Sequence, residues 1–295
     1  MKILILCIHY PVASGRYIAR AFKRLGHEVR TGGPEVGNKI WGIDVDPRHN
    51  WPPDFDPARD DWQPDLVITA DSGYYLDWRP IPETPFVLWG VDNHTRTYHE
   101  LNQQFDALFL AHSWAARMGE PNTHWLPPGY DPQAHTDLGL ERDYDVAMIG
   151  IPYPERIQIM QTMQEAGLKV IGKLGALGDD YNALYNRAKI ALVKSLCGDL
   201  PMRFLENMAQ GCCILADPIP DADNLGFLAG TDYWPYETAD DAVTAAKSLI
   251  VSGAWRNIAA QGKAKVTPHT WDARALEFLR RVEQKQYAPD LELAL

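Results

Sequence analysis

The hydrophobic positions of the chain fall into short, unbroken runs that alternate with amphipathic segments of helical period. An apolar run is typical of a strand buried on both faces of a parallel sheet, and a stripe at i, i+3, i+4 and i+7 is typical of a helix packed against it. The sequence therefore predicts an α/β fold in which strands and helices alternate. The predicted strands cover residues 2–8, 27–31, 66–70, 86–89, 107–111, 124–126, 144–149, 169–171, 190–193 and 212–216.

Helical patterns separate most of these runs, and three more follow the last of them. The predicted helices cover residues 16–25, a segment that begins near 156, residues 181–188, one helix between 199 and 211, and residues 240–251, 254–266 and 271–282. The last of these keeps an apolar stripe, with Thr270 as its N-cap. Residues 32–64 are rich in Pro, Gly and Asp but contain Trp41, Trp51 and Trp62. Because indole rings are costly to leave in water, we predict an ordered irregular segment there.

Composition narrows the class of protein. At 295 residues and 46% hydrophobic content, the chain can bury one large core or two ordinary ones, and two is the better expectation. Its net charge of −11 argues against affinity dominated by phosphate contacts to nucleic acid or anionic lipid. No run is long enough to span a membrane, and the N-terminus does not have the pattern of a signal peptide. Cys7, Cys197, Cys212 and Cys213 show no metal spacing, so we expect reduced thiols in a cytoplasmic protein.

The segment at residues 194–217, KSLCGDLPMRFLENMAQGCCILAD, connects two predicted buried strands through one helix. We place the N-cap of this helix at Asp199, with Pro201 in the first turn and Gly211 at the C-terminal position that favours a left-handed backbone. One side of the helical wheel is apolar. The other side is wholly polar, and it is either a solvated face with an ion pair or a ligand-binding face. Its residues are Arg203, Glu206, Asn207 and Gln210.

Part of this segment follows an Arg-Phe-x-Glu-x-x-Ala-x-Gly pattern, and an apolar strand ending in Asp comes after it. The pattern is formed by Arg203, Phe204, Glu206, Ala209 and Gly211. It resembles the donor-binding segment of GT-B glycosyltransferases of the retaining "glycosyl transferases group 1" type, closest to the CgeB-like branch. The resemblance is patchy in the first half of the chain and nearly continuous afterwards.

The resemblance implies a GT-B fold, in which two Rossmann-like domains face a central cleft. Residues 1–130 would form the acceptor-side domain and residues 131–268 the nucleotide-sugar-binding domain. The helix in residues 269–295 would cross back onto the first domain.

The resemblance also implies roles for residues of the second domain. Glu206 would accept hydrogen bonds from the ribose hydroxyls, which suits a carboxylate, and the helix start would hold the diphosphate, which suits its free amides. In the patch YDVAMIGIPYPERIQIM, Gly150 and Arg156 match a glycine-to-basic motif whose cation meets the donor phosphates. The remaining residues of the expected donor site are Lys194, Asp199, Leu200, Pro201, Met202 and Arg203.

Two places in the first half are candidates for the chemistry, because ligands of parallel sheets bind outside the carboxyl ends of the strands. Asp92 and His94 follow the strand at 86–89, where the family often places a His or Asp near the transferred sugar. Asp92 would orient the imidazole or take the proton of the acceptor, and a purely structural His94 is the alternative. The loop with Ser14, Gly15 and Arg16 is either an acceptor or phosphate loop or an ordinary βα turn.

The function implied by the resemblance is transfer of a sugar from a nucleoside diphosphate sugar, with a UDP-sugar expected, to an acceptor hydroxyl with retention. We expect no metal and no further cofactor. Gly198 stands where many relatives carry a second Glu, so the sugar identity stays open. The acceptor could be a small molecule, a glycan, a protein or a hydroxymethylated base in DNA, and the acidic charge disfavours DNA. A nucleotide-sugar-binding protein without turnover is the alternative from a different class.

Overall fold

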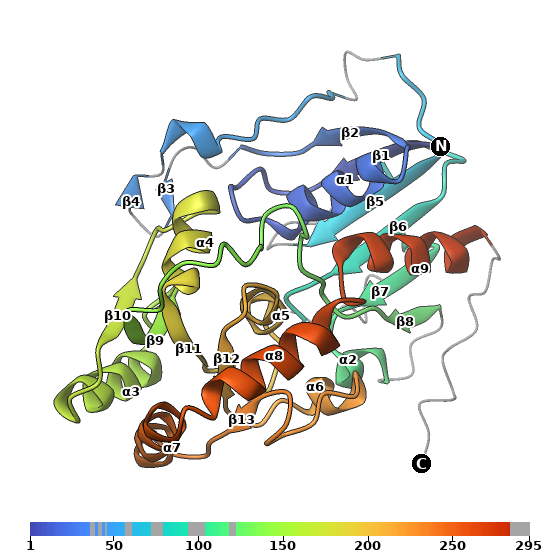
Figure 1. Cartoon of the computed structure of the whole chain (residues 1–295). Coiled ribbons are helices and arrows are strands. Elements are labelled where there is room, and N and C mark those ends of the chain that lie inside the picture. The colour runs from blue at the N-terminus through green and yellow to red at the C-terminus, as the bar shows by residue number, and fades with distance from the viewer. Residues whose placement is uncertain are drawn as a thin grey trace. The chain divides into compact units, whose positions relative to one another are not determined.

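The computed structural model describes residues 1–35, 39–40, 43–44, 46–56, 61–71, 79–93, 104–117 and 122–283. The chain forms two compact units (Figure 1). Unit 1 comprises Met1–Lys39, Asp46–Pro128 and Trp271–Leu295, and unit 2 comprises Ile40–Val45 and Gly129–Thr270. The domain boundaries near residues 130 and 268 stay a prediction about how the chain divides in solution.

Unit 1 is built on a six-stranded parallel sheet with the order β2-β1-β5-β6-β7-β8. The order changes direction between β1 and β5, which makes the carboxyl ends of these strands the natural ligand position. The strands are β1 (Lys2–Leu6), β2 (Glu28–Gly32), β5 (Leu66–Asp71), β6 (Phe86–Gly90), β7 (Ala107–Leu110) and β8 (Thr123–Trp125). The helices are α1 (Ser14–Arg24), α2 (Ser113–Ala116) and α9 (Trp271–Glu283), with a 3₁₀ turn at Pro47–His49. A separate two-stranded sheet pairs β3 (Lys39–Ile40) with β4 (Ile43–Asp44).

Successive side chains of the unit 1 strands point to opposite faces and pack against different elements. On one face Phe278 of α9 packs with its ring centroid 5.0 Å from that of Trp89 and 4.6 Å from that of Phe109. On the other face the irregular segment supplies Phe55 and Trp62, which join the core of the sheet. The described part of that segment is thus ordered, as predicted, whereas Trp41 lies outside the described residues.

The last helix returns to unit 1, as the sequence predicts. α9 packs against α1, and a salt bridge of 2.7 Å joins Arg24 to Asp272 between them. Its apolar stripe, including Trp271 and Phe278, is fully buried.

Unit 2 is built on a five-stranded parallel sheet with the order β10-β9-β11-β12-β13. Here the order changes direction between β9 and β11. The strands are β9 (Tyr144–Ile149), β10 (Val170–Lys173), β11 (Ala188–Val193), β12 (Cys213–Ala216) and β13 (Trp234–Pro235). The helices are α3 (Pro154–Glu165), α4 (Gly178–Asn186), α5 (Met202–Ala209), α6 (Pro220–Asn224), α7 (Ala239–Ser252) and α8 (Trp255–Val266).

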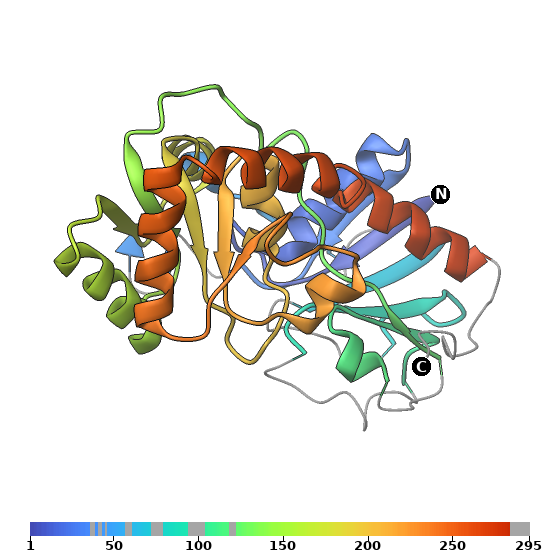
Figure 2. The same cartoon turned by 60° about the horizontal axis from the view of Figure 1, so that its bottom comes forward.

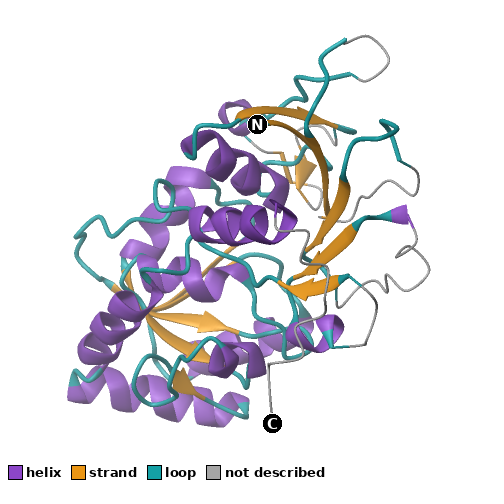
Figure 3. Ribbon diagram, turned by 90° about the vertical axis from the view of Figure 1, so that its right-hand side faces the viewer, coloured by secondary structure: helices purple, strands orange, loops and turns teal. Residues whose placement is uncertain are grey.

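Both faces of the unit 2 sheet are covered by helices (Figures 2 and 3). Val146 and Met148 share one core with Ile159 of α3 and with side chains of α7. Ala147, between them, joins the opposite core with residues of α4 and α5, such as Phe204. Burial on both faces explains why these strands appear as unbroken apolar runs in the sequence.

The short elements β13, α2 and α6 were not predicted, because segments of two to five residues carry too little periodicity to be recognised. The sequence predicts that the four cysteines are reduced thiols. Cys7, Cys212 and Cys213 are buried and Cys197 is exposed, and all four are free thiols. Among the described residues, no helix is both long and apolar enough to cross a membrane.

Candidate functional site

The loop between β11 and α5 is closed by Asp199. Its Oδ1 accepts hydrogen bonds from the backbone amides of Leu196 at 2.7 Å and Cys197 at 3.2 Å. The helix begins at Met202, with Pro201 as N-cap and no side-chain cap. The expectation that Asp199 caps the helix is therefore wrong, because its carboxylate is taken up by the turn that precedes the helix. The first amides of α5 thus have no side-chain acceptor, as an anion site at a helix start requires.

The polar face of α5 is buried. Glu206 is 6% exposed, and Asn207 and Gln210 are fully buried. Gln210 Nε2 donates to Asn182 Oδ1 on α4 at 2.8 Å. The interpretation of a solvated face is therefore wrong: the wheel predicts which residues share a side but not that α4 covers that side. The C-terminal end is as predicted, since Gly211 has φ of +76°.

The Glu206 carboxylate has partners on two other segments of unit 2. Tyr181 of α4 donates its hydroxyl to Glu206 Oε2 at 2.8 Å. His135 Nε2 lies 3.5 Å from Glu206 Oε1. A buried carboxylate without such partners would be costly, so these contacts offset the burial of Glu206.

Arg203 lies over Gly150, which follows β9. The guanidinium Nη1 is 3.4 Å from Ile149 O. A Cβ placed on Gly150 would lie 3.1 Å from both Nη1 and Nη2, and the φ of Gly150 is +134°. Glycine is thus needed at this position both for the backbone conformation and for the close approach of the cation.

Arg156, in the first turn of α3, brings a second guanidinium to the same end of the sheet. Its Nη2 donates to Lys194 O at 2.7 Å, its Nη1 donates to Ile151 O at 3.2 Å, and its side chain stacks on Tyr153. Burial, and then the positive charge of Arg203, lower the pKa of Arg156 to about 10. These acceptors are carbonyl oxygens, which do not neutralise a guanidinium. Two cations close enough to repel one another, beside a glycine, favour binding of an anion between them.

Lys194, also expected in the donor site, has a different partner. Its Nζ donates to Asp217 Oδ2 at 2.7 Å. Asp217 follows β12 and also accepts hydrogen bonds from the amide and the hydroxyl of Ser195, at 2.7 and 2.6 Å. The Lys194 charge is thus matched within the protein. Leu200, which is 2% exposed, anchors the loop in the core, so only its backbone could face a ligand.

In unit 1 the Ser14–Arg16 segment is the first turn of α1. A Cβ placed on Gly15 would lie 2.6 Å from Cys7 Sγ, so this glycine serves the packing of α1 on β1. Arg16 Nη1 donates to Pro11 O at 2.9 Å and His49 O at 3.1 Å, which tethers the irregular segment. Ser14 is buried. A contact of this loop with phosphate or acceptor stays a prediction.

Asp92 and its neighbours lie at the carboxyl end of the unit 1 sheet. Burial and the nearby Asp92 charge raise the pKa of Tyr10, which places Asp92 close to the loop after β1. Asn93 Oδ1 accepts a hydrogen bond from the His112 amide at 3.2 Å. His94, the other expected residue, lies outside the described residues.

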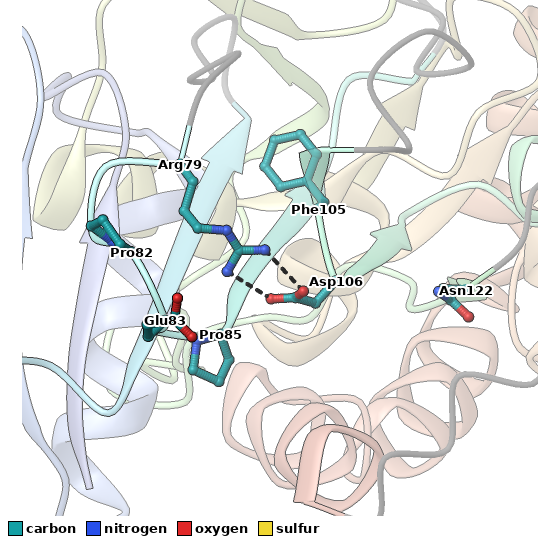
Figure 4. A pocket seen from close by; sticks show the side chains of 7 residues that line it. All are labelled: Arg79, Pro82, Glu83, Pro85, Phe105, Asp106 and Asn122. Atoms are coloured by element: carbon teal, nitrogen blue, oxygen red, sulfur yellow. Dashed lines mark hydrogen bonds and ion pairs between the residues drawn. The ribbon is translucent and has the colours of Figure 1, made fainter.

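A cavity of about 680 Å³ lies at the opposite edge of this sheet, beside the amino ends of β6, β7 and β8 (Figure 4). Arg79 and Asp106 form an ion pair of 2.9 Å across it, and Asp106 also accepts from the Phe86 amide at 2.7 Å. Arg79 and Asp106 satisfy one another, and the cavity lies away from the carboxyl ends of the strands. It is therefore no part of the candidate site.

Sequence reasoning missed Tyr181, His135 and Asp217 as parts of the site. The strand ending in Asp217 was noticed only as part of the family pattern. The sequence predicts Tyr181 only as the first residue of a helix, and His135 lies in no predicted strand or helix. No spacing rule connects them to Glu206, since they come from separate segments.

Two parallel α/β units, each with a change of strand order at which ligands bind, define the GT-B class of fold. Solved glycosyltransferases share this fold over their whole length. HepE of Anabaena, in a complex with UDP-glucose, matches with a TM-score of 0.67 at 12% identity, covering 96% of this chain and 100% of that one. Sucrose-phosphate synthase of Thermosynechococcus elongatus matches with a TM-score of 0.66 at 14% identity, covering 97% and 99%.

Residues 137–280 match the model of a family described as glycosyl transferase-like. The narrower resemblance to the CgeB-like branch stays a prediction. A search of curated proteins gave no match. Among the described residues, no group of three His, Cys, Asp or Glu side chains is arranged to hold a metal ion.

Proposed function

We propose that the protein transfers a sugar from a nucleoside diphosphate sugar, with UDP as the expected nucleotide, to an acceptor hydroxyl. The observation that carries this proposal is the pair of guanidinium groups of Arg156 and Arg203 beside Gly150, on the same side of α5 as a buried carboxylate. Diphosphate and ribose are the two parts of a nucleotide donor that such a site can recognise.

In this proposal Arg156 and Arg203 bind the diphosphate, with the amides at Leu200–Met202 as further donors. Their charge stabilises the leaving group as its bond to the anomeric carbon breaks. Glu206 accepts hydrogen bonds from the ribose. The position of Lys194 beside Asp217 assigns it to holding the loop, and a phosphate contact through it is a weaker part of the proposal.

The acceptor oxygen forms the new bond to the anomeric carbon, and its proton passes to a base. Asp92 and His94 are the groups we propose for that side of the reaction, with His94 near the transferred sugar. Retention of configuration is proposed from the family resemblance. Leaving-group stabilisation by arginine makes a metal ion unnecessary in this scheme, and the four free thiols fit the reducing cytoplasm.

The test is a transfer assay with UDP-, GDP- and ADP-sugars and a panel of small-molecule, glycan, protein and hydroxymethylated DNA acceptors, each run with and without EDTA. We expect turnover of one nucleotide class, unchanged by EDTA. Turnover restored only by Mn²⁺ or Mg²⁺ after chelation would contradict the metal-independent scheme. Donor binding without transfer or hydrolysis would instead identify a binding protein, the alternative suggested by Gly198.

The His94→Ala variant tests the unit 1 side of the proposal. An interaction gained mainly in the transition state appears in the rate rather than in ground-state binding. We therefore expect donor affinity to stay the same while single-turnover transfer slows. A variant with the wild-type rate would leave Asp92 or the Ser14–Arg16 loop as the candidates.

A further inference from the structure

Two donors from separate segments meet the Glu206 carboxylate, one at each oxygen. The Tyr181 hydroxyl, 2.8 Å from Oε2, is a hydrogen bond of ordinary length. His135 Nε2, at 3.5 Å from Oε1, is a longer and weaker contact. The Tyr181 hydroxyl also lies 3.3 Å from Asn207 Oδ1, so its ring is directed at the polar face of α5.

The other ring nitrogen of His135 determines where its proton resides. Nδ1 lies 3.2 Å from the amide nitrogen of Asp131, which can only donate, so Nδ1 must be the acceptor. The neutral imidazole therefore carries its hydrogen on Nε2, the nitrogen that faces Glu206. His135 is 5% exposed, and its ring packs edge-on to Tyr181 with centroids 6.0 Å apart.

Each carboxylate oxygen can accept two hydrogen bonds. With the Tyr181 hydroxyl bonded to Oε2 and His135 beside Oε1, Glu206 is held in a single orientation, and among the described residues these contacts leave one acceptor position open on each oxygen. Two free positions on a carboxylate of fixed orientation suit the two adjacent hydroxyls of a ribose.

We propose that Tyr181 and His135 are positioning residues that fix Glu206, and that they thereby make the site select ribonucleotides over nucleotides without ribose hydroxyls. This inference rests on the proposed function, because it assigns a ribose to Glu206. Without the Tyr181 hydroxyl, the carboxylate loses its shorter hydrogen bond and the fixed orientation that two-point recognition requires.

The experiment measures a ratio that general damage to the fold does not change. By calorimetry, wild-type protein is titrated with UDP, GDP and ADP, and with the 2′,3′-dideoxy analogue of the tightest binder. We expect the ribonucleotide to bind roughly tenfold more tightly or better, because charge-assisted bonds to Glu206 are lost in the analogue. Glu206→Gln should remove most of this preference.

The decisive variant is Tyr181→Phe, which keeps the ring and removes only the hydroxyl. Its ribose preference should fall by roughly fivefold, the size of one net hydrogen bond, while affinity for the dideoxy analogue stays at the wild-type value. Tyr233→Phe is the matched control. The Tyr233 ring packs on Phe204 of α5, the helix that carries Glu206, but its hydroxyl lies near Asp223 and not near Glu206. It should keep the full preference.

Each outcome decides a different statement. If wild-type protein binds none of the three nucleotides, the proposed function fails. If wild type prefers the ribonucleotide and Glu206→Gln abolishes that preference while Tyr181→Phe retains it, the positioning role is overturned and the proposed function stands. His135→Gln gives a second test: its loss of preference should be smaller than that of Tyr181→Phe, because its contact with Glu206 is longer, and the two losses should be coupled in the double variant.

Discussion

Each unit has a glycine shortly after a central strand, Gly15 in the first turn of α1 and Gly150 directly after β9, and the two glycines have different surroundings. In unit 1 the side chain closest to a Cβ on Gly15 would be Cys7, from the strand that the helix packs on. In unit 2 the group closest to a Cβ on Gly150 would be the guanidinium of Arg203. A glycine after a strand therefore does not by itself indicate a phosphate site. What lies over it decides whether it serves packing or a ligand.

The two glycines also differ in the arginine side chains around them. In unit 1, Arg16 of α1 donates to two carbonyl oxygens that tether the irregular segment, and burial and the Arg20 charge lower its pKa, but among the described residues no guanidinium lies over Gly15. In unit 2, the guanidinium of Arg203 lies over the glycine itself, and its charge contributes to lowering the pKa of the nearby Arg156. The guanidinium over Gly150 is the difference on which the proposed ligand site of unit 2 rests.

The largest difference between the two units in nucleotide binding is expected from substitution of the unit 2 arginines. Arg203→Met or Arg156→Met should each weaken binding of a nucleoside diphosphate by roughly 1.5 to 3 kcal/mol, the value of a hydrogen bond to a charged group. Arg187→Met, which removes a unit 2 arginine paired with Asp143, is the control and should leave affinity unchanged. Calorimetry with the diphosphate and with the uncharged nucleoside separates a phosphate contact from a general loss, because the nucleoside should bind wild type and all three variants equally.

A smaller and more specific effect is expected from substituting the two glycines. Gly15→Ala should lower the free energy of unfolding by about 1 to 3 kcal/mol through overpacking against Cys7, with no change in nucleotide affinity. Gly150→Ala should cost about 1 to 3 kcal/mol through its positive φ, and should in addition displace Arg203 and weaken nucleotide binding. Denaturant unfolding and calorimetry on both variants check this. Equal losses of nucleotide affinity in Gly15→Ala and Gly150→Ala would contradict the statement that only Gly150 lies at the nucleotide site.

The smallest effect concerns the thiols. Burial raises the pKa of Cys7 to about 12, so a thiol reagent should not label it in the native protein. Cys197, in the loop before α5, is exposed, although burial of its sulfur and the Asp199 charge raise its pKa too. Because only the thiolate reacts, Cys197 labelling should be slow at neutral pH and accelerate as the pH rises past about 9, the ordinary thiol pKa range. Labelling of two or more thiols in folded protein would contradict the burial described here.

The sequence was sufficient for the parts of the fold that depend on local pattern. Strands buried on both faces gave apolar runs, and Gly211 marked the end of α5 as expected. The stripe of the last helix predicted its buried side. These features were predictable because each is determined by residues close together in the chain.

The features that were mispredicted depend on distant segments. Asp199 does not cap the helix, because its carboxylate accepts hydrogen bonds from two amides of the preceding loop. The burial of Glu206 was decided by α4 and by the segment with His135. A helical wheel contains no information about either neighbour, so the polar face could be recognised as unusual but not as buried.

The central claim is that unit 2, and not the glycine loop of unit 1, holds the nucleotide. The most direct measurement is a crystal structure of the protein with a bound nucleoside diphosphate. We predict the diphosphate beside Gly150, in contact with the Arg156 and Arg203 guanidinium groups, and the ribose hydroxyls within hydrogen-bond distance of Glu206. A nucleotide bound at Ser14–Arg16, or one with its ribose away from Glu206, would contradict the claim.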